Sequence, residues 1–304
     1  MRLDRAVRER LQISWNEARR KIETGKIRID GKVVTDPALD VDGPETLDYQ
    51  PDAPRPKKPL DLERSAIVHL DPHVVVVEKS SGLLTVPFEG HEKDTLDQQL
   101  RRLLSKISPV TGSRRSAMPP LMVLHRLDRG TSGLLVFART FAAKEHLAKQ
   151  FRAHSAHRRY LALVHGDMAS QTFRSHLVID RGDGIRGSSE HAKGRGERRG
   201  GKEAITHVEA VEHLRGATLL SCRLETGRTN QIRIHLAEAG HPLIGETIYL
   251  RDFEKTPIVA PRLMLHAAEL GFVHPQSGDT MMFTSPLPDA FETMVASLRQ
   301  GQRP

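Results

Sequence analysis

Cysteine is almost absent from this sequence, which has one such residue among 304. A single thiol, Cys222, excludes a disulfide within the chain and any metal site built from a cysteine cluster. It lies in the apolar run ATLLSCRLE, where a buried and inert thiol is the ordinary interpretation. We therefore expect neither a disulfide framework nor thiol chemistry.

Long apolar runs are absent as well. No segment approaches the ~20 apolar residues that are needed to cross a bilayer. The first ten residues, MRLDRAVRER, lack the apolar core of a signal peptide. With 38% hydrophobic and 28% charged residues, the composition is that of a globular protein rather than a disordered one. We expect a soluble protein of the cytoplasm.

Acidic residues are outnumbered by basic ones, 38 against 46, which gives a formal net charge of +8 and a pI near 9.8. This surplus favours a polyanionic partner, because each Lys or Arg that meets a phosphate releases condensed counterions. Nucleic acid is the leading candidate, and an anionic membrane surface comes second. The chain length of 304 residues is typical of one large domain with one small domain.

The first 48 residues predict a small module of two helices and a hairpin. Ser14 and Glu17 stand three residues apart before an amphipathic segment, and Gly25 follows it. This arrangement is typical of a helix with a capping box and a glycine stop. Asp30 and Gly31 then separate two short β-branched runs, which predicts a tight hairpin turn.

This segment resembles the S4 RNA-binding module through WNEARRKIETGKIRIDGKVV. The resemblance implies an α/β module at residues 1–48 that binds folded RNA. The basic residues that would contact RNA are Arg19, Arg20, Lys21, Lys26 and Arg28. The same residues also fit a merely solvated helix face, since Lys and Arg are common on any exposed helix.

A proline-rich stretch follows the module. QPDAPRPKKP, residues 50–59, has four prolines and no apolar periodicity, so we predict a semi-rigid linker over residues 49–64. Beyond it, helices are predicted from Thr140 to Phe151 and over residues 229–240. Seven runs of strand length predict an α+β domain over residues 65–304: SAIVHL, HVVVVEK, PLMVLH, GLLVFAR, RYLALVHG, THVEAVEHL and ATLLSCRLE.

Residues 182–202 interrupt this pattern. The stretch GDGIRGSSEHAKGRGERRGGK contains few apolar residues, and it has six Lys or Arg against two Glu. It cannot bury enough apolar surface to offset its ordering entropy, so we predict a mobile loop. Folding onto RNA and a simple solubilising role are both open to it.

The most informative segment is HRLDRGTSGLLVFART at residues 125–140. Asp128 lies between two arginines, and turn-forming residues follow it before an apolar strand. Three further segments occur in order: HVVVVEKSSGLLTVP, RRYLALVHG, and GKEAITHVEAVEHLRGATLLSCRLETGRTNQIRIHLAEAGHPLIGE. Together they resemble the RluA-type pseudouridine synthases over most of residues 65–285. The resemblance implies a catalytic domain with a large mixed, mainly antiparallel sheet.

The implied reaction breaks the N1–C1′ bond of uridine, rotates the uracil and rejoins it through C5. It needs a nucleophile, a proton shuttle, a dry pocket and a way to extrude the base. No outside reactant is consumed, so we expect no cofactor and no metal.

The resemblance assigns the nucleophile to Asp128, whose carboxylate can attack or stabilise the sugar carbon. It assigns to Arg233 the cation that keeps this carboxylate ionised. Tyr160 is the family's active-site tyrosine, and stacking on uracil and proton transfer are both open to it. Arg126 is expected to fill the space of the extruded base. Further expected RNA contacts are Arg129, Thr131, Arg139 and Arg228.

Taken one at a time, these residues have ordinary structural explanations. An aspartate such as Asp128 between arginines is most often a salt-bridged turn residue. Tyr160 alone fits a core aromatic, and Arg233 alone fits a helix-surface cation. His154 and His157 have metal-ligand spacing but no further ligands nearby, and phosphate contact or solvent exposure fits them and their arginine neighbours better. The glycine strings lack Walker spacing.

Some positions depart from the family pattern. Asn230 stands where the family usually has histidine, Ser80 and Ser81 replace a common proline, and Glu246 replaces aspartate. None of these changes removes one of the three assigned catalytic residues. Asn230 adjoins the arginine helix, so we expect any effect on rate or site choice to come from it.

The expected function is isomerisation of specific uridines in structured RNA by a monomer. Large-subunit ribosomal RNA is the leading substrate, because members of this family with an S4 domain tend to act there. A transfer-RNA substrate and a non-catalytic RNA-binding or ribosome-assembly factor are the alternatives. A glycoside hydrolase is weaker, since that chemistry ordinarily requires two carboxylates.

Overall fold

The chain divides into two compact units, residues 1–61 and 62–304. The computed structural model describes residues 2–29, 31–35, 37, 39, 41, 47–54, 62–87, 92–107, 120–191 and 201–301. Part of the predicted linker, residues 55–61, lies outside these ranges. Within them, no helix has the length and apolar character that crossing a membrane requires.

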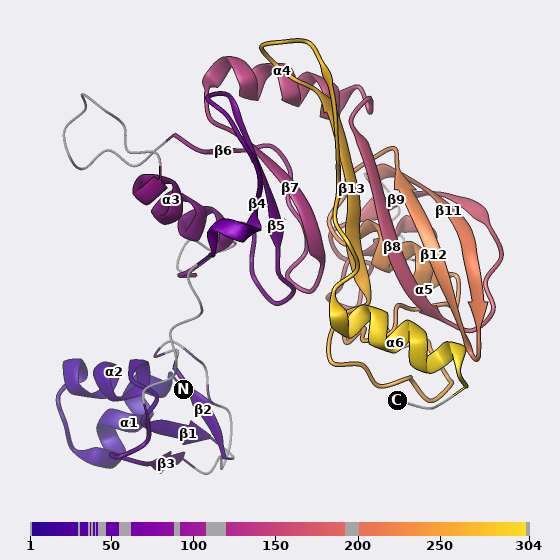
Figure 1. Ribbon diagram of the computed structural model, residues 1–304. Helices are drawn as coiled ribbons and strands as arrows, with labels where there is room; N and C mark the ends of the chain where they lie inside the picture. Colours follow the sequence, from indigo (N-terminus) through magenta and orange to yellow (C-terminus); the bar gives the residue numbers. More distant parts are fainter. Residues whose placement is uncertain are drawn as a thin grey trace. The chain divides into compact units, whose positions relative to one another are not determined.

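The first unit packs two helices on a three-stranded antiparallel sheet of order β2-β1-β3 (Figure 1). The predicted capping box is present, because the Ser14 hydroxyl accepts a hydrogen bond from the Glu17 N–H and the Glu17 carboxylate accepts one from the Ser14 N–H. The elements are α1 Leu3–Leu11, α2 Trp15–Glu23, β1 Ile27–Ile29, β2 Lys32–Val34 and β3 Leu47–Tyr49. Their shared core is Leu3, Val7, Ala18, Ile22, Ile27 and Leu47.

The predicted hairpin of this unit is confirmed by the antiparallel pairing of β1 with β2. Asp30 lies outside the described residues, and Gly31 has a φ of +76°, a left-handed conformation that favours glycine. Strand β3 was not predicted. It pairs with β1 from the far side, and such a long-range pairing leaves little trace in local sequence.

The second unit is built on a sheet of 11 strands with the path β10-β9-β11-β12-β8-β13-β7-β5-β4 (Figure 1). Strand β14 pairs with β13, and β6 pairs with β7. All pairings are antiparallel except that of β13 with β7. The strands are β4 Ile67–Leu70, β5 Val74–Lys79, β6 Met122–Val123, β7 Ser132–Ala138, β8 His157–His165, β9 Gln171–Val178, β10 Gly187–Ser188, β11 Lys202–Leu214, β12 Ala217–Leu224, β13 Leu265–Val273 and β14 Thr280–Thr284.

The helices of this unit agree with the predictions in part. Helix α4 begins after Thr140, whose side chain accepts a hydrogen bond from the Ala143 N–H at 3.1 Å, as predicted. Helix α5 is shorter than predicted, because Asn230 has a left-handed φ of +59° and the helix begins after it. The helical elements are α3 Leu96–Ile107, α4 Phe141–Arg152, α5 Gln231–Glu238, α6 Asp289–Arg299, η1 Arg64–Ala66 and η2 Ser189–His191.

The centre of the sheet supplies the core that positions the site. Every residue of β7 is buried, and the valines of β5 are buried beside it. Helix α6 packs Phe291, Met294 and Val295 against the same hydrophobic cluster as Leu163 of β8. Burial of this kind on both faces makes β7 and β8 rigid supports for the residues at their ends.

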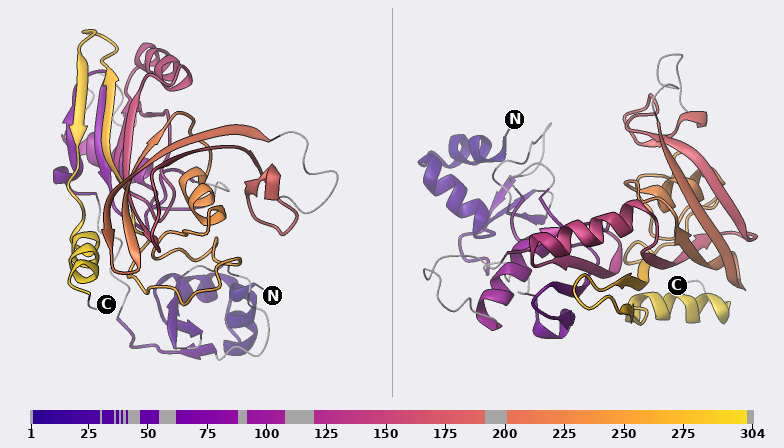
Figure 2. Two further views of the ribbon diagram at one scale, coloured as in Figure 1. Left: turned by 90° about the vertical axis from the view of Figure 1, so that its right-hand side faces the viewer. Right: turned by 90° about the horizontal axis from the view of Figure 1, so that it is seen from above.

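The stretch predicted as a mobile loop, residues 182–202, differs from that prediction where it is described. It contains β10 and η2, and Lys202 opens β11. Strands β9 and β11 form a curved arm that carries this segment at its end (Figure 2). Residues 192–200 lie outside the described ranges.

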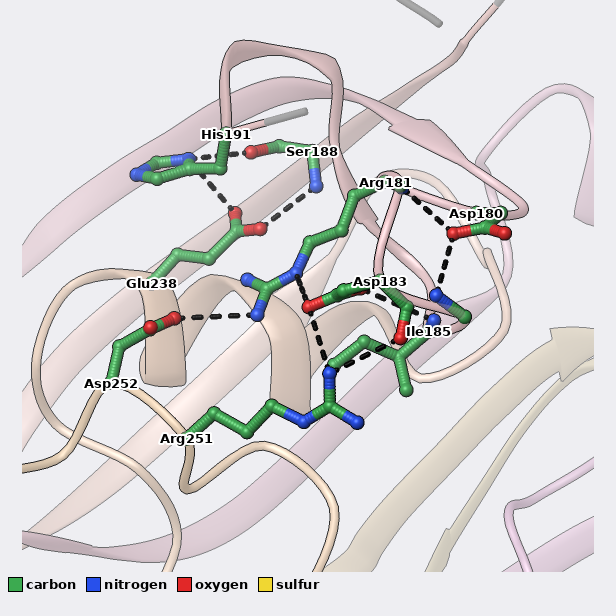
Figure 3. A network of polar contacts seen from close by, with 11 residues as sticks. Asp180, Arg181, Asp183, Ile185, Ser188, His191, Glu238, Arg251 and Asp252 are labelled. Atoms are coloured by element: carbon green, nitrogen blue, oxygen red, sulfur yellow. Dashed lines mark hydrogen bonds and ion pairs between the residues drawn. The ribbon is translucent and has the colours of Figure 1, made fainter. Parts of the chain in front are cut away.

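Polar contacts tie this segment to its neighbours (Figure 3), in addition to the packing of Ile185 against a small hydrophobic cluster, and composition did not reveal them. The buried Arg181 donates to Asp183 at 2.9 Å and pairs with Asp252 at 3.3 Å. The backbone N–H of Ser188 donates to Glu238, the last residue of α5, at 2.8 Å. Hydrogen bonds to charged groups order a chain that has few apolar side chains.

Candidate active site

The loop between β6 and β7 forms one wall of a cleft of about 660 Å³ in the second unit. The segment that leads into α5, strand β8 and helix α4 also line it. The lining residues are Val123 to Asp128, Thr131, Ala148, Phe151, Arg152, His154, Arg158, Tyr160, Leu224, Gly227 to Ile232, and Leu265. The two predicted residues Asp128 and Tyr160 therefore share one cavity.

Close packing against β13 fixes where this loop ends. Gly133 has a φ of +110°, and a Cβ atom there would lie 2.2 Å from the backbone oxygen of Ala267. Only glycine allows β7 to start so near its parallel neighbour. On the opposite side of the loop, the Thr85 hydroxyl donates to the Leu127 carbonyl at 2.9 Å. The loop is thus held from two directions immediately around Asp128.

Asp128 is partly buried, with 21% of its side chain exposed. Burial raises the pKa of its carboxyl group, because the charged form loses solvation. Arg233, Arg126, the N–H of Asn230 and Lys79 oppose this effect by stabilising the ionised form. The net pKa remains above the ordinary aspartate value, so the charge of Asp128 depends on the cations around it.

Arg233 lies on α5 and reaches the carboxylate of Asp128, with 3.9 Å between Nη1 and Oδ2. Its stronger partner is Glu246, which accepts from Nε at 2.8 Å and from Nη2 at 2.7 Å. Nη1 also donates to the side-chain oxygen of Asn230 at 3.0 Å, and the guanidinium lies 5.1 Å from the ring of Tyr249. Arg233 is therefore a fixed cation that faces the carboxylate of the loop.

Tyr160 lies on β8 with 7% of its surface exposed. Burial raises the pKa of its phenol, the charge of Arg158 lowers it, and the charge of Asp128 raises it. Asp128 is thus close enough to Tyr160 to influence it electrostatically. The structure brings together all three residues that the sequence assigned to catalysis.

Lys79 is a buried cation beside this site that the sequence analysis did not identify. Its side chain has no exposed surface, and Nζ donates to the carbonyls of Ser80 at 3.0 Å, Leu83 at 2.8 Å and Arg129 at 3.2 Å. Burial lowers its pKa to about 7, while Asp128 raises it. The available signal was a lysine at the end of VVVVEK, two residues after a run of four valines.

The other RNA-contact candidates of this unit fall into two groups. Arg126, Thr131 and Arg228 line the cleft. Arg126 donates to the Thr229 hydroxyl at 2.9 Å, and the buried Thr131 hydroxyl has no hydrogen-bond partner among the described residues. Arg129 and Arg139 do not line the cleft: they donate instead to the carbonyls of Gly82 and Asp71, respectively.

In the first unit, the five basic candidates also differ in their surroundings. Arg19 and Arg20 are exposed on α2, and Arg19 donates to the buried Asp4. The remaining three donate to oxygen atoms of their own unit: Lys21 to the Tyr49 hydroxyl, Lys26 to the Ala53 carbonyl, and Arg28 to the Gly31 carbonyl.

The prediction of phosphate contact or solvent exposure for His154 and His157 was wrong for His157. His154 is exposed and lines the cleft, but His157 forms a hydrogen bond with Glu269 at 2.8 Å. Arg159 also pairs with Glu269, and Arg158 is buried. The partner of His157 and Arg159 is a residue of the neighbouring strand, and the local sequence does not show such cross-strand contacts. No cluster of three His, Cys, Asp or Glu suited to a metal occurs in the ranges that the structure describes.

Comparison with known proteins decides the family. The family model described as RNA pseudouridylate synthase matches residues 73–238, and that of the S4 domain matches residues 1–46. The chain belongs to the RNA pseudouridylate synthase family. This result confirms the resemblance that the motifs around Asp128 indicated.

Relatives of this pseudouridylate synthase match along nearly its whole length. It is 33% identical to the ribosomal large subunit pseudouridine synthase D of Zymomonas mobilis, covering 99% of this chain and 95% of that one. It is 32% identical to the protein of the same name from Vibrio cholerae, covering 99% and 92%. Family membership identifies the enzyme class as an isomerase that forms pseudouridine in RNA.

The fold agrees with a solved structure of the same family. Human RNA pseudouridylate synthase domain containing 4 superposes with a TM-score of 0.60 at 20% identity, covering 77% of this chain and 93% of that one. The predicted α+β class with a large mixed, mainly antiparallel sheet is thereby confirmed.

Proposed function

We propose that this pseudouridine synthase isomerises specific uridines of large-subunit ribosomal RNA and that Asp128 is its nucleophile. The observation that carries the proposal is the shared cleft, in which the Asp128 carboxylate lies 3.9 Å from the Arg233 guanidinium and close to Tyr160. The substrate assignment is supported by relatives that are named ribosomal large subunit pseudouridine synthase D. We place this activity in the cytoplasm and assign it to a monomer.

Asp128 would act on C1′ of a uridine that has left its helix. As the N1–C1′ bond breaks, a carboxylate oxygen bonds to C1′ and the uracil takes the bond's electron pair. Only the ionised carboxylate can do this. Arg233 offsets part of the cost of burying that charge, so its role is to keep Asp128 deprotonated.

Tyr160 would form the platform for the uracil ring, because it lines the cleft and is almost fully covered. The upward shift of its pKa keeps the phenol protonated at neutral pH. A protonated phenol can donate to a base or sugar oxygen but does not accept a proton readily. We therefore assign stacking and hydrogen-bond donation, rather than general-base catalysis, to Tyr160.

The rim of the cleft would bind the RNA backbone. Arg126, Arg152 and Arg228 are exposed and line the opening. Exposed arginines at a rim are suited to phosphates, which fix the register of an RNA without reading its sequence. We place Arg126 nearest the space of the extruded base, because it also influences the pKa of Asp128.

The first unit would provide a second RNA contact. Residues 1–46 match the S4 domain, and Arg19 and Arg20 are exposed on its helix α2. Residues 49–64 would connect this unit to the catalytic unit, residues 65–304. Two linked RNA-binding units raise the overall affinity through effective concentration.

The test uses transcripts of large-subunit ribosomal RNA and of transfer RNA, with pseudouridine mapped after incubation with the protein. Asp128→Ala should lower turnover by at least about a thousandfold, as expected when a nucleophile is removed. Asp167→Ala, which changes an aspartate with an 86% exposed side chain, serves as the matched control. Full activity of Asp128→Ala would refute the nucleophile assignment, and modification of transfer RNA alone would refute the substrate.

A non-catalytic RNA-binding protein makes a different prediction for the same experiment. It would bind both transcripts in a salt-sensitive way, bind equally well as Asp128→Asn, and leave no isomerised base. Pseudouridine formed by the wild type and abolished in Asp128→Asn would exclude this alternative.

A further inference from the structure

The cleft contains a second buried cation that the proposed mechanism does not use. Arg158 lies on β8 with 7% of its surface exposed, and its side chain lines the cleft together with Tyr160. Its Nη2 atom donates to the carbonyl of Glu225 at 3.1 Å, and its Nε atom has no hydrogen-bond partner in the described part of the chain.

The surroundings of this guanidinium are apolar or neutral rather than acidic. Its carbon atom Cζ lies 5.5 Å from the centre of the Phe151 ring. That ring stacks at 4.6 Å on His125, whose pKa is lowered by burial to about 3, so the imidazole is neutral. No carboxylate among the described residues forms an ion pair with Arg158, and burial lowers its pKa.

A buried cation without an anionic partner destabilises a protein. A protein retains an unpaired buried cation where a bound ligand supplies the negative charge. Gly227, which lines the cleft too, allows the backbone to lie close to this guanidinium, since a Cβ atom there would be 2.9 Å from Nη1 of Arg158. Arg158 is therefore prepared for a group that enters through the cleft.

The geometry of strand β8 indicates which chemical group of a ligand would meet Arg158. Residues two apart on a strand point to the same face and lie about 7 Å apart, so Arg158 and Tyr160 face the cleft side by side. Asp128 and Arg158 both act electrostatically on Tyr160. A uracil that stacks on Tyr160 with its C1′ at Asp128 would point its pyrimidine edge toward Arg158.

We propose that Arg158 binds the uracil base and stabilises the negative charge that it acquires during the reaction. This inference rests on the proposed function. When the N1–C1′ bond breaks, its electron pair stays on the base and is shared by N1, O2 and O4. After rotation, C5 bonds to C1′, the bond to Asp128 breaks, and the proton of C5 is exchanged for one on N1. Arg158 holds the detached base through these steps.

Burial distinguishes this role from phosphate binding. A phosphate that remains in the RNA backbone stays near the rim, where Arg126, Arg152 and Arg228 are exposed. An extruded base can reach further into the cleft, to a guanidinium that is 7% exposed and lies against the Phe151 ring. An electrostatic contact in such a water-poor pocket has a larger effect on a developing charge than one at the surface.

The experiment compares Arg158→Gln with the wild type in single-turnover reactions on large-subunit ribosomal RNA transcribed with uridine or with 5-fluorouridine. It follows cleavage of the N1–C1′ bond, because C5 of 5-fluorouridine has no proton that the last step could release. Fluorine makes the base a better leaving group, so the reaction depends less on charge stabilisation. Arg158→Gln should lose about a hundredfold in rate with uridine and clearly less with 5-fluorouridine. Its RNA affinity should change little, and Arg158→Lys should retain part of the rate.

Arg159→Gln is the matched control, because Arg159 is the next residue of the strand and pairs with Glu269 outside the cleft. It should keep the wild-type rate. Thermal unfolding gives a further readout: Arg158→Gln removes an unpaired buried charge, so it should unfold at the same temperature as the wild type or higher.

Three results would overturn the assignment of Arg158: an unchanged rate, a lower unfolding temperature that accounts for the loss, or equal losses with both bases accompanied by weaker, less salt-dependent RNA binding. The last pattern would mark Arg158 as a phosphate contact. A wild-type protein that isomerises no uridine would instead overturn the proposed function, and this inference with it.

Discussion

Two carboxylates share the charge of Arg233. Glu246 binds the guanidinium through two hydrogen bonds of 2.7 and 2.8 Å, whereas the nearest oxygen of Asp128 is 3.9 Å away. Glu246 therefore fixes the position of Arg233, and it also neutralises much of its charge. The raised pKa of Asp128 is consistent with this division.

Replacing Glu246 tests whether this residue fixes the position of Arg233 and neutralises part of its charge. Glu246→Gln leaves Arg233 buried without its main partner, so the free energy of unfolding should fall by about 3–5 kcal/mol, measured by urea denaturation. A displaced Arg233 should also lower kcat roughly 10–100-fold. Because a displaced Arg233 no longer stabilises the ionised carboxylate, the pKa of Asp128 should rise and the acid limb of the pH–rate profile should move to higher pH.

Glu246→Asp is the control for this change. It keeps the carboxylate and restores the residue that the family usually has, so it should retain most of the stability and activity. Equal stability of Glu246→Gln and wild type would contradict the role of Glu246.

At the scale of elements, Lys79 joins the end of β5 to the loop that carries Asp128. Its ammonium donates to two carbonyls of the turn after β5 and to the carbonyl of Arg129, the residue after the nucleophile. A buried lysine is a costly way to join two loops, because the charge loses its solvation. The position of the carboxylate therefore depends on a group that titrates near neutrality.

The lowered pKa of Lys79 predicts a specific pH dependence of stability. Its ordinary pKa is 10.5 and its folded pKa is about 7, so the unfolded chain binds more protons between these values. The stability contributed by this group is thus fully present above pH 10.5 and is lost as the pH falls to about 7. The unfolding free energy of wild type relative to Lys79→Met should rise with pH in this window by up to about 1.4 kcal/mol per unit.

Urea denaturation at several pH values between 6 and 10 measures this difference. A constant difference between the two proteins across the window would show that Lys79 keeps its ordinary pKa.

At the scale of the whole molecule, most of the positive net charge lies in the second of the two compact units, because residues 1–61 have 13 Lys or Arg against 12 Asp or Glu. The catalytic unit has exposed arginines at the rim of its cleft, and the first unit has them on α2. Both sets are suited to phosphates. The general affinity for RNA is then expected to depend on both units, and the chemistry on one of them.

Arg20→Ala in the full-length protein tests this separation. If Arg20 contacts a phosphate, the variant should bind ribosomal RNA more weakly, and the slope of log K against log salt should decrease by about one. Turnover at saturating RNA should be unchanged. Filter binding at several salt concentrations measures the slope, and Arg215→Ala, an exposed arginine of the β11–β12 turn, is the control. A loss of turnover at saturation would contradict the separation.

Local patterns in the sequence predicted the elements that local interactions determine. The capping box at Ser14, the start of α4 at Thr140 and the strand before Lys79 all follow from neighbouring residues. Strands β9 and β13 were missed, because their partners β11 and β8 are distant in sequence. Strand β14 was missed as well, although it forms a hairpin with β13. The left-handed Asn230 shortened α5 at a position where composition alone favoured helix.

The sequence by itself determined the family, and through that resemblance it predicted Asp128 as the nucleophile and Arg233 as its cation, because the chemistry requires particular residues at particular spacings. Only the tertiary structure decided that Glu246 holds Arg233 more closely than Asp128 does, that Lys79 is buried, and that Arg158 faces the cleft without an acidic partner. Burial and long-range contacts set the energy of a charge, and both arise only when distant strands pack together.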